Sequence, residues 1–207
     1  MRRPLLALAA LALLALPAAA HADSASHSDP QVQRLLDAKK TLKWNYATAS
    51  SDRYGHAEAL VDAPAEKVSK VVTDFGRYKE LHRKFASARV VAKEGDSTDV
   101  YMKYPVQIGK FTIDFHEVMR FAPLRAESGS NVVEGRGVKG DMKQGHLRIS
   151  VKPVDDKHSL LVVDVLLVPK IPAPQALVDE ELRDGAEDYV NGIKDRAQGR
   201  PGPVTQL

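Results

Sequence analysis

Apolar and polar side chains alternate in several stretches of the chain, which is the pattern of β-strands with one buried and one wet face. The clearest stretch is residues 111–121, where every odd position is apolar except Glu117. Residues 159–168 are apolar at almost every position, as expected for a strand buried on both faces. We predict strands over residues 54–61, 88–92, 100–104, 111–121, 131–136, 147–151 and 159–168.

A spacing of three to four residues between apolar positions predicts helices in other parts of the chain. The first covers residues 29–43, where Asp29 can cap and Pro30 suits the first helical position. Two short helices, starting near residues 62 and 74, follow the first strand. These segments place helices on both sides of the first strand.

A long amphipathic helix closes the pattern. Pro172 and Pro174 precede it, and an apolar stripe runs from Leu177 to Ile193 with charged residues opposite. The predicted order is strand, two helices, about six further strands and a long helix. Because short turns join the consecutive strands, we expect an antiparallel sheet and the α+β fold class.

The first 22 residues have the three parts of a secretory signal peptide. Two arginines precede an apolar run over residues 5–16, and Ala20-His21-Ala22 supplies the small residues that a signal peptidase needs. The run is shorter than the roughly 20 apolar residues of a spanning helix. We therefore predict export to the periplasm with cleavage after Ala22; an uncleaved N-terminal anchor is the alternative.

Four segments follow from this division. Residues 1–22 are the signal peptide, 23–52 an N-terminal extension with a short helix, 53–197 the main domain and 198–207 a flexible Pro/Gly-rich tail. The mature domain is long enough to bury about 70% of its unfolded surface. A single domain with its own core is therefore expected.

Charge and composition exclude several classes of function. The chain has 30 basic and 27 acidic residues, and loss of Arg2 and Arg3 leaves 28 − 27 = +1. So small a net charge argues against a nucleic-acid partner, which needs a concentrated basic face. There are no cysteines, so disulfides, a thiolate nucleophile, a cysteine-ligated metal and a lipoprotein-type anchor are all excluded.

Short motifs in the chain do not indicate a nucleotide, metal or hydrolase site. Residues 135–140 satisfy G-x-G-x-x-G, but the residues that follow alternate like a strand, whereas a dinucleotide site needs a helix there. We interpret them as a glycine-rich hairpin. The histidines are scattered without metal-ligand spacing, so we predict no metal and no cofactor, leaving open only a site assembled by tertiary folding. No G-x-S-x-G elbow supports a hydrolase.

Three stretches together resemble a known superfamily. They are ALVDAPAEKVSKVVTDFGRYKELH, GHLRISVKPVDDKHSLLVVDVLLVP and KIPAPQALVDEELRDGAEDYVNGIKDR. They resemble the START-like superfamily, also called SRPBCC, which includes polyketide cyclases and coenzyme-Q-binding proteins. The resemblance covers residues 53–197. It implies a helix-grip fold, in which a curved antiparallel sheet wraps around the long C-terminal helix and a cavity lies between them; a fully packed core is the alternative.

The cavity lining is predicted from the apolar parity of the strands and the apolar stripe of the last helix. Glu117 is the anomaly in this set, because a buried carboxylate must be paired, hydrogen-bonded or neutralised. It is either a polar anchor for a ligand or a structural group, re-aimed by a bulge or held in a salt bridge. The predicted ligand-binding residues are Val100, Met102, Tyr104, Phe111, Ile113, Phe115, Glu117, Met119, Leu147, Ile149, Leu161, Val163, Val178, Leu182 and Tyr189.

These features favour a binding protein over an enzyme, with no catalytic residue assigned. The leading hypothesis is an exported binding protein for a hydrophobic small molecule or lipid, with transient membrane contact, no nucleic acid and no protein partner named. One alternative is an aromatase/cyclase-type enzyme, in which Glu117, Tyr104 or Tyr101 would supply general acid or base. Export argues against it, because acyl-carrier substrates are cytoplasmic. Another is a non-catalytic partner in a cell-envelope complex, docked through residues 29–44 and the tail.

Overall fold

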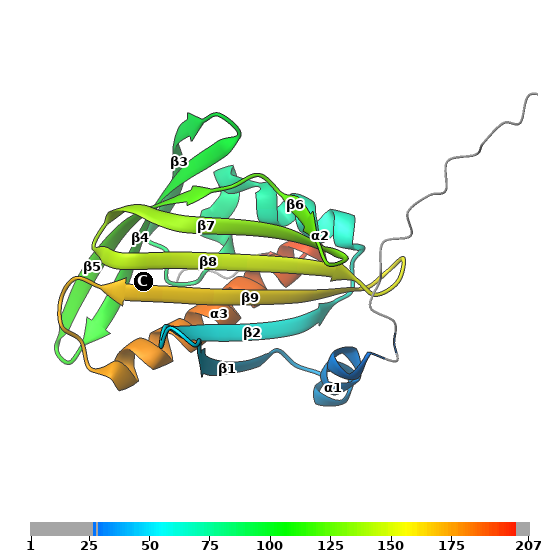
Figure 1. The fold of residues 1–207 in the computed structure, drawn as a ribbon. Helices are drawn as coiled ribbons and strands as arrows, with labels where there is room; N and C mark the ends of the chain where they lie inside the picture. The colour runs from blue at the N-terminus through cyan, green and yellow to red at the C-terminus, as the bar shows by residue number, and fades with distance from the viewer. Residues whose placement is uncertain (1–26, 28, 202–207) are drawn as a thin grey trace, which may run out of the picture.

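The computed structural model describes residue 27 and residues 29–201 (Figure 1). The predicted signal peptide, residues 1–22, and residues 202–207 of the predicted tail lie outside the described residues. Within the described part of the chain, no helix combines the length and the apolar character needed to cross a membrane.

The described residues form one sheet and a small set of helices. The helices are α1 (Pro30–Ala38), α2 (Ala65–Thr73), the 3-10 helix η1 (Phe75–Leu81) and α3 (Gln175–Ala197). The strands are β1 (Leu42–Ala47), β2 (Arg53–Val61), β3 (Ser87–Glu94), β4 (Ser97–Ile108), β5 (Phe111–Phe121), β6 (Arg125–Glu127), β7 (Ser130–Gly140), β8 (Met142–Pro153) and β9 (Ser159–Pro169). All pairings are antiparallel in the order β1-β2-β9-β8-β7-β5-β4-β3, and β6 pairs with β7.

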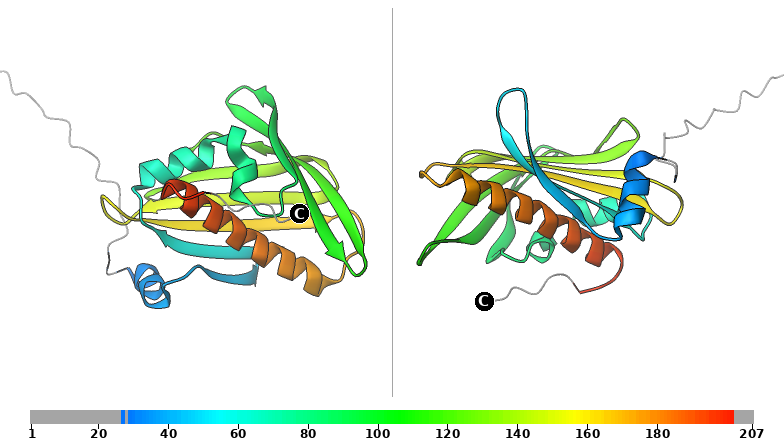
Figure 2. Two further views of the ribbon diagram at one scale, coloured as in Figure 1. Left: turned by 180° about the vertical axis from the view of Figure 1, so that it is seen from behind. Right: turned by 90° about the horizontal axis from the view of Figure 1, so that it is seen from below.

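The sheet curves around α3, which crosses its concave face (Figures 1 and 2). The C-terminal end of α3 contacts α2 and η1, which close that end of the sheet. The predicted α+β helix-grip fold is confirmed. The strand pattern and the long amphipathic helix predict the α+β class, and the resemblance to the START-like superfamily implies the wrapping of the sheet around the helix.

Strand alternation decides which side chains face α3. In β5, Phe115, Glu117 and Met119 are buried, whereas Asp114 and His116, which point to the opposite face, are exposed. The glycine-rich stretch 135–140 lies in β7 and at the turn to β8, so the hairpin interpretation is confirmed. The buried face of the sheet is thus the face that the sequence pattern predicts.

Two glycines bring α3 against its neighbours at backbone distance. A Cβ at Gly55 in β2 would overlap the backbone carbonyl of Leu182 in α3. A Cβ at Gly192 in α3 would likewise overlap the backbone carbonyl of Leu81 at the end of η1. The close packing of α3 against β2 and η1 therefore depends on positions that have no side chain.

The N-terminal segment differs from its prediction. Helix α1 ends at Ala38, where Lys39 takes a left-handed conformation with φ 53°, and does not reach Lys43. The chain then enters β1, which pairs with β2 along its whole length. Alternating Leu42, Trp44 and Tyr46 suit a strand, and this period-two pattern outweighs helix propensity here.

Both N-terminal elements pack on the sheet. Val32 and Leu35 of α1 are buried against Val154 and Leu160 at the end of the sheet. The boundary predicted at residue 53 consequently falls between two paired strands. Residues 29–44, the docking segment of the cell-envelope hypothesis, include α1 and the start of β1.

Candidate ligand-binding cavity

Two small cavities lie between the sheet and α3. The inner cavity has a volume of about 70 Å³ and is lined by His82, Lys84, Phe85, Met102, Tyr104, Val106, Glu117, Met119, His146, Leu147, Val165, Leu167, Glu181, Gly185 and Tyr189. The outer cavity has a volume of about 60 Å³ and is lined by Tyr104, Val106, Ile108, Phe115, Met142, Leu167, Pro169, Ala173, Leu177, Val178, Glu181 and Leu182. Tyr104, Val106, Leu167 and Glu181 line both cavities and so form the wall between them.

Most of the predicted lining residues fall into three groups. Those at the inner cavity are Met102, Tyr104, Glu117, Met119, Leu147 and Tyr189. Those at the outer cavity are Tyr104, Phe115, Val178 and Leu182. Those in the packed core, away from both cavities, are Val100, Ile149, Leu161 and Val163.

Two predicted lining residues lie elsewhere. Phe111 is 75% exposed at the tip of the β4–β5 hairpin, so its assignment to a buried lining is wrong. Ile113 is half-buried and packs with Val106, Phe115 and Met142 near the outer cavity. The alternation along β5 identifies the face of the strand correctly, but α3 does not cover the end of the hairpin.

Several lining residues are absent from the predicted set. Val165 and Leu167 continue the inward parity of Leu161 and Val163 in β9, so extending that pattern would have found them. His82 and Phe85 lie between η1 and β3, where no periodic pattern exists. Only tertiary folding places such residues beside a cavity.

Glu117 is the acidic side chain buried deepest in the inner cavity, with 3% of its surface exposed. Its carboxylate accepts one hydrogen bond, from the backbone N–H of Met142 at 3.3 Å, and has no ion-pair partner among the described residues. Burial raises the pKa of Glu117 to about 7, against smaller lowering effects of the Met142 hydrogen bond and the charge of Lys170. The salt-bridge explanation of this residue is therefore not supported.

The glycines of the G-x-G-x-x-G stretch make room for this carboxylate. A Cβ at Gly137 would overlap Oε1 of Glu117, and a Cβ at Gly140 would overlap Oε2. Gly145 on β8 lies on the same side, with its Cβ position 3.3 Å from Oε1. The glycines of the motif thus leave the space that the buried Glu117 carboxylate occupies.

The hydroxyl of Tyr104 is a second polar group at the cavity. Its oxygen is buried without a hydrogen-bond partner among the described residues. Burial, and after it the negative charge of Glu117, raise the pKa of Tyr104 well above its ordinary value. A ligand with one polar group could satisfy this hydroxyl and the carboxylate together.

His82 is a neutral third polar group. Burial lowers its pKa to about 3, and the charges of Lys84 and Arg83 add to the effect. Its Nδ1 accepts the backbone N–H of Lys84 at 3.2 Å, which assigns the ring proton to Nε2. The ring stacks on Phe85, with centroids 4.7 Å apart. Apart from these groups, His146 and the Lys84–Glu181 ion pair at 2.8 Å, the lining is apolar except for Gly185.

Tyr101 does not belong to the site. It lies on the opposite face of β4 and makes a 2.6 Å hydrogen bond with Nδ1 of His116. Among the acid–base candidates predicted from the sequence, only Glu117 and Tyr104 line the cavity.

Comparison with solved structures identifies the fold. A STAR-related lipid transfer protein from Xanthomonas axonopodis has a TM-score of 0.64 at 14% identity, over 77% of this chain and 94% of that one. A START superfamily protein from Mycobacterium smegmatis has a TM-score of 0.59 at 19% identity, over 70% and 97%. The Zhui aromatase/cyclase from a Streptomyces species has a TM-score of 0.52 at 15% identity, over 70% and 93%.

No protein-family model matches the sequence, and no curated protein matches it. The similarity to solved structures nevertheless gives this chain the START-like fold, as its three sequence stretches predict.

Proposed function

We propose that this protein is an exported carrier that binds a hydrophobic small molecule or lipid between its sheet and α3. The observation that carries the proposal is an apolar cavity with one buried, unpaired carboxylate, Glu117, at its wall. Such a combination suits a ligand with a long apolar part and a single hydroxyl or similar donor group. The similarity to structures described as lipid transfer proteins supports the same class of ligand.

Binding must enlarge the cavity. Sites for small ligands have volumes of about 300–1,000 Å³, whereas the inner and outer cavities measure about 70 and 60 Å³. The first turns of α3 are the part best suited to move, because Leu177 and Val178 are only half-buried and no side chain caps the helix at Pro174. Displacement of these turns would join the two cavities.

A filling substitution tests the binding site. A Cβ at Gly185 lies 3.4 Å from Nε2 of His82, close to ordinary contact, so a larger side chain can project into the inner cavity. We expect Gly185→Leu to fold at least as well as wild type, because leucine has a helix propensity about 1 kcal/mol better than glycine. Lipid recovered with the purified protein should fall at least about tenfold, since the added side chain competes for the same volume.

The measurement is solvent extraction and mass spectrometry of protein purified from its own host. Gly76→Leu is the matched control, because a Cβ at Gly76 meets nothing closer than 3.9 Å and lies outside both cavities. Absence of any apolar molecule from repeated wild-type preparations would count against the proposal. Equal lipid content in both variants would place the ligand elsewhere.

An exposed end of the molecule supports the proposal that the bound molecule is exchanged at a membrane. The tip of the β4–β5 hairpin and the β9–α3 loop lie at the same end (Figure 2), where Phe111 is 75% and Ile171 42% exposed. Lys110 and Lys170 are exposed beside them. Apolar side chains flanked by cations suit shallow insertion into an anionic lipid surface.

Phe111→Ser should weaken binding to vesicles that contain anionic phospholipid by about tenfold, because the aromatic ring is the largest apolar group offered to the bilayer. Its exposure means that the melting temperature should stay within the error of wild type. Val91→Ser is the matched control, since Val91 is 43% exposed on β3. Equal loss in both variants in a flotation assay would contradict a specific docking end.

A cyclase-type enzyme is the second candidate. The observation that favours it is that one cavity is lined both by Glu117, whose pKa of about 7 suits a general acid or base, and by the unpartnered hydroxyl of Tyr104. This candidate predicts turnover of a bound polyketide-like compound, whereas a carrier would release the molecule unchanged. Mass spectrometry of the bound compound before and after incubation distinguishes the two.

A further inference from the structure

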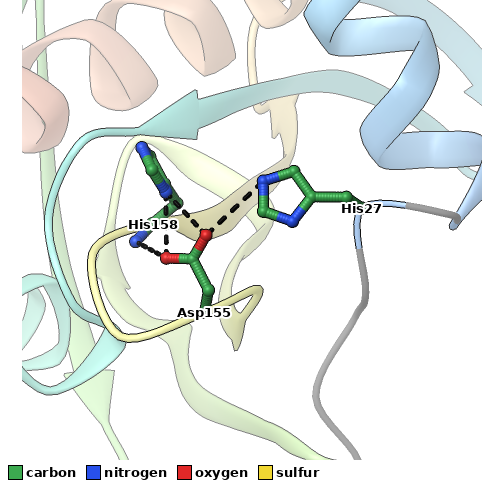
Figure 3. Close-up of side chains that lie close together, drawn as sticks. All are labelled: His27, Asp155 and His158. Atoms are coloured by element: carbon green, nitrogen blue, oxygen red, sulfur yellow. Dashed lines mark hydrogen bonds and ion pairs between the residues drawn. The ribbon is translucent and has the colours of Figure 1, made fainter.

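Two histidines and an aspartate meet at the end of the sheet that carries α1 (Figure 3). His158 and Asp155 belong to the turn between β8 and β9, and His27 lies just before α1. One ligand atom from each residue lies within 4.8 Å of the other two. The sequence contains no metal-ligand spacing because His27 is far from the other two residues along the chain.

The carboxylate of Asp155 contacts both histidines and the backbone of its own turn, and Nδ1 of His158 lies 2.9 Å from Oδ1. Its Oδ1 accepts the backbone N–H groups of Lys157 and His158 at 2.7 and 2.8 Å. Its Oδ2 lies 2.8 Å from Nδ1 of His158 and 3.4 Å from Nε2 of His27 (Figure 3). Asp155 is therefore the residue that connects the two histidines.

Hydrogen bonds to backbone carbonyls hold both segments that supply the cluster. The turn is closed by a 3.0 Å hydrogen bond from the N–H of Val154 to the carbonyl of His158. On the other side, the carbonyl of His27 accepts a hydrogen bond from the side chain of Gln33 in α1. The cluster is therefore presented by two anchored segments.

We propose that His27, Asp155 and His158 bind a divalent transition-metal ion, for which Zn²⁺ is the best fit. Two imidazole nitrogens and one carboxylate oxygen are ordinary zinc ligands, and a three-ligand set leaves a fourth position for water. Tetrahedral bonds of 2.0–2.1 Å place ligand atoms about 3.4 Å apart, which matches the separation of His27 Nε2 from Asp155 Oδ2. The His158–Asp155 hydrogen bond would open by about half an ångström to admit the ion.

The ion would join the segment before α1 to the β8–β9 turn. This end of the sheet is opposite the start of α3 (Figure 2), so the metal site is separate from the proposed ligand cavity. Because the ion binds only when both segments are in place, it should stabilise the folded N-terminal segment.

The test uses the chain expressed with its own N-terminal segment, purified without a histidine tag and treated with chelator. Isothermal titration with Zn²⁺ should give one equivalent bound per chain. His27→Ala, His158→Ala and Asp155→Asn should each weaken binding by more than about tenfold. Asp155→Asn is the sharpest variant, because an amide oxygen still accepts the turn N–H groups at Oδ1 while the group facing the histidines loses its charge.

His116→Ala is the matched control, since His116 is exposed on β5 and outside the cluster. Zn²⁺ should also raise the melting temperature of the wild type and slow proteolysis before α1, and both effects should vanish in Asp155→Asn. No binding by the wild type, or binding that the three variants leave unchanged, would show that these contacts are ion pairs only.

Discussion

Leu182→Asp is expected to destabilise the domain by on the order of 5 kcal/mol, because it removes a core side chain and buries a charge. Leu182 is 2% exposed and lies where α3 meets Gly55 of β2. The backbone of α3 touches Gly55 of β2 at this position, so the helix cannot turn the aspartate toward solvent without losing that contact. For a domain of this size, such a loss corresponds to a fall in melting temperature of about 10–20 °C.

Thermal and urea unfolding measure this effect. Ala176→Asp is the matched control, because Ala176 is exposed in the first turn of the same helix, where the helix dipole favours an acid. Its melting temperature should remain near that of wild type. A mild effect of Leu182→Asp, comparable to the control, would mean that α3 is not gripped by the sheet.

The long elements of the fold are predicted by the sequence, whereas a short edge strand is not. Period-two patterns give the long strands, and the stripe from Leu177 to Ile193 gives α3, because both signals extend over many residues. Strand β1 escaped prediction because it is short and follows a helix whose left-handed end at Lys39 has no glycine to mark it. Local patterns therefore define the architecture but not every edge of the sheet.

The candidate site was less predictable than the fold. Alternation shows which face of a strand is buried, but not whether a given residue meets a packed core, as Ile149 does, or a cavity, as Leu147 does. It also cannot show that a hairpin projects past α3, as at Phe111. Glu117 was found because an acid on an apolar face breaks the pattern, whereas the space that the glycines leave for it depends on the pairing of β5 with β7.

Glu117→Gln should make the protein more stable than wild type above neutral pH. The pKa of Glu117 is about 7 in the folded protein against an ordinary value of 4.5. Between these values the folded state holds a proton that the unfolded state has released, so wild-type stability falls as pH rises from 4.5 to 7. The fall amounts to about 3 kcal/mol, and it should be absent from the variant.

Urea unfolding at pH 5 and pH 8 measures this difference, as the change in stability of the variant relative to wild type. Asp114→Asn is the matched control on the same strand, because Asp114 is exposed and pairs with Lys103 at 2.7 Å. The control should show no gain at pH 8. A Glu117→Gln variant that is less stable than wild type at pH 8 would show that the carboxylate is structural.

Ligand affinity tests the role of Glu117 independently of stability. If the carboxylate accepts a hydrogen bond from the ligand, wild type should bind a long-chain alcohol more tightly than the hydrocarbon of equal length. Glu117→Gln should reduce the affinity for the alcohol by about tenfold to a hundredfold and leave the hydrocarbon unchanged, because the apolar contacts remain. If the carboxylate serves only the fold, Glu117→Gln should change the affinities for the alcohol and the hydrocarbon equally, or change neither. If Glu117→Gln gains stability and selectively loses alcohol binding, the Glu117 carboxylate is a ligand-binding group and not a structural one.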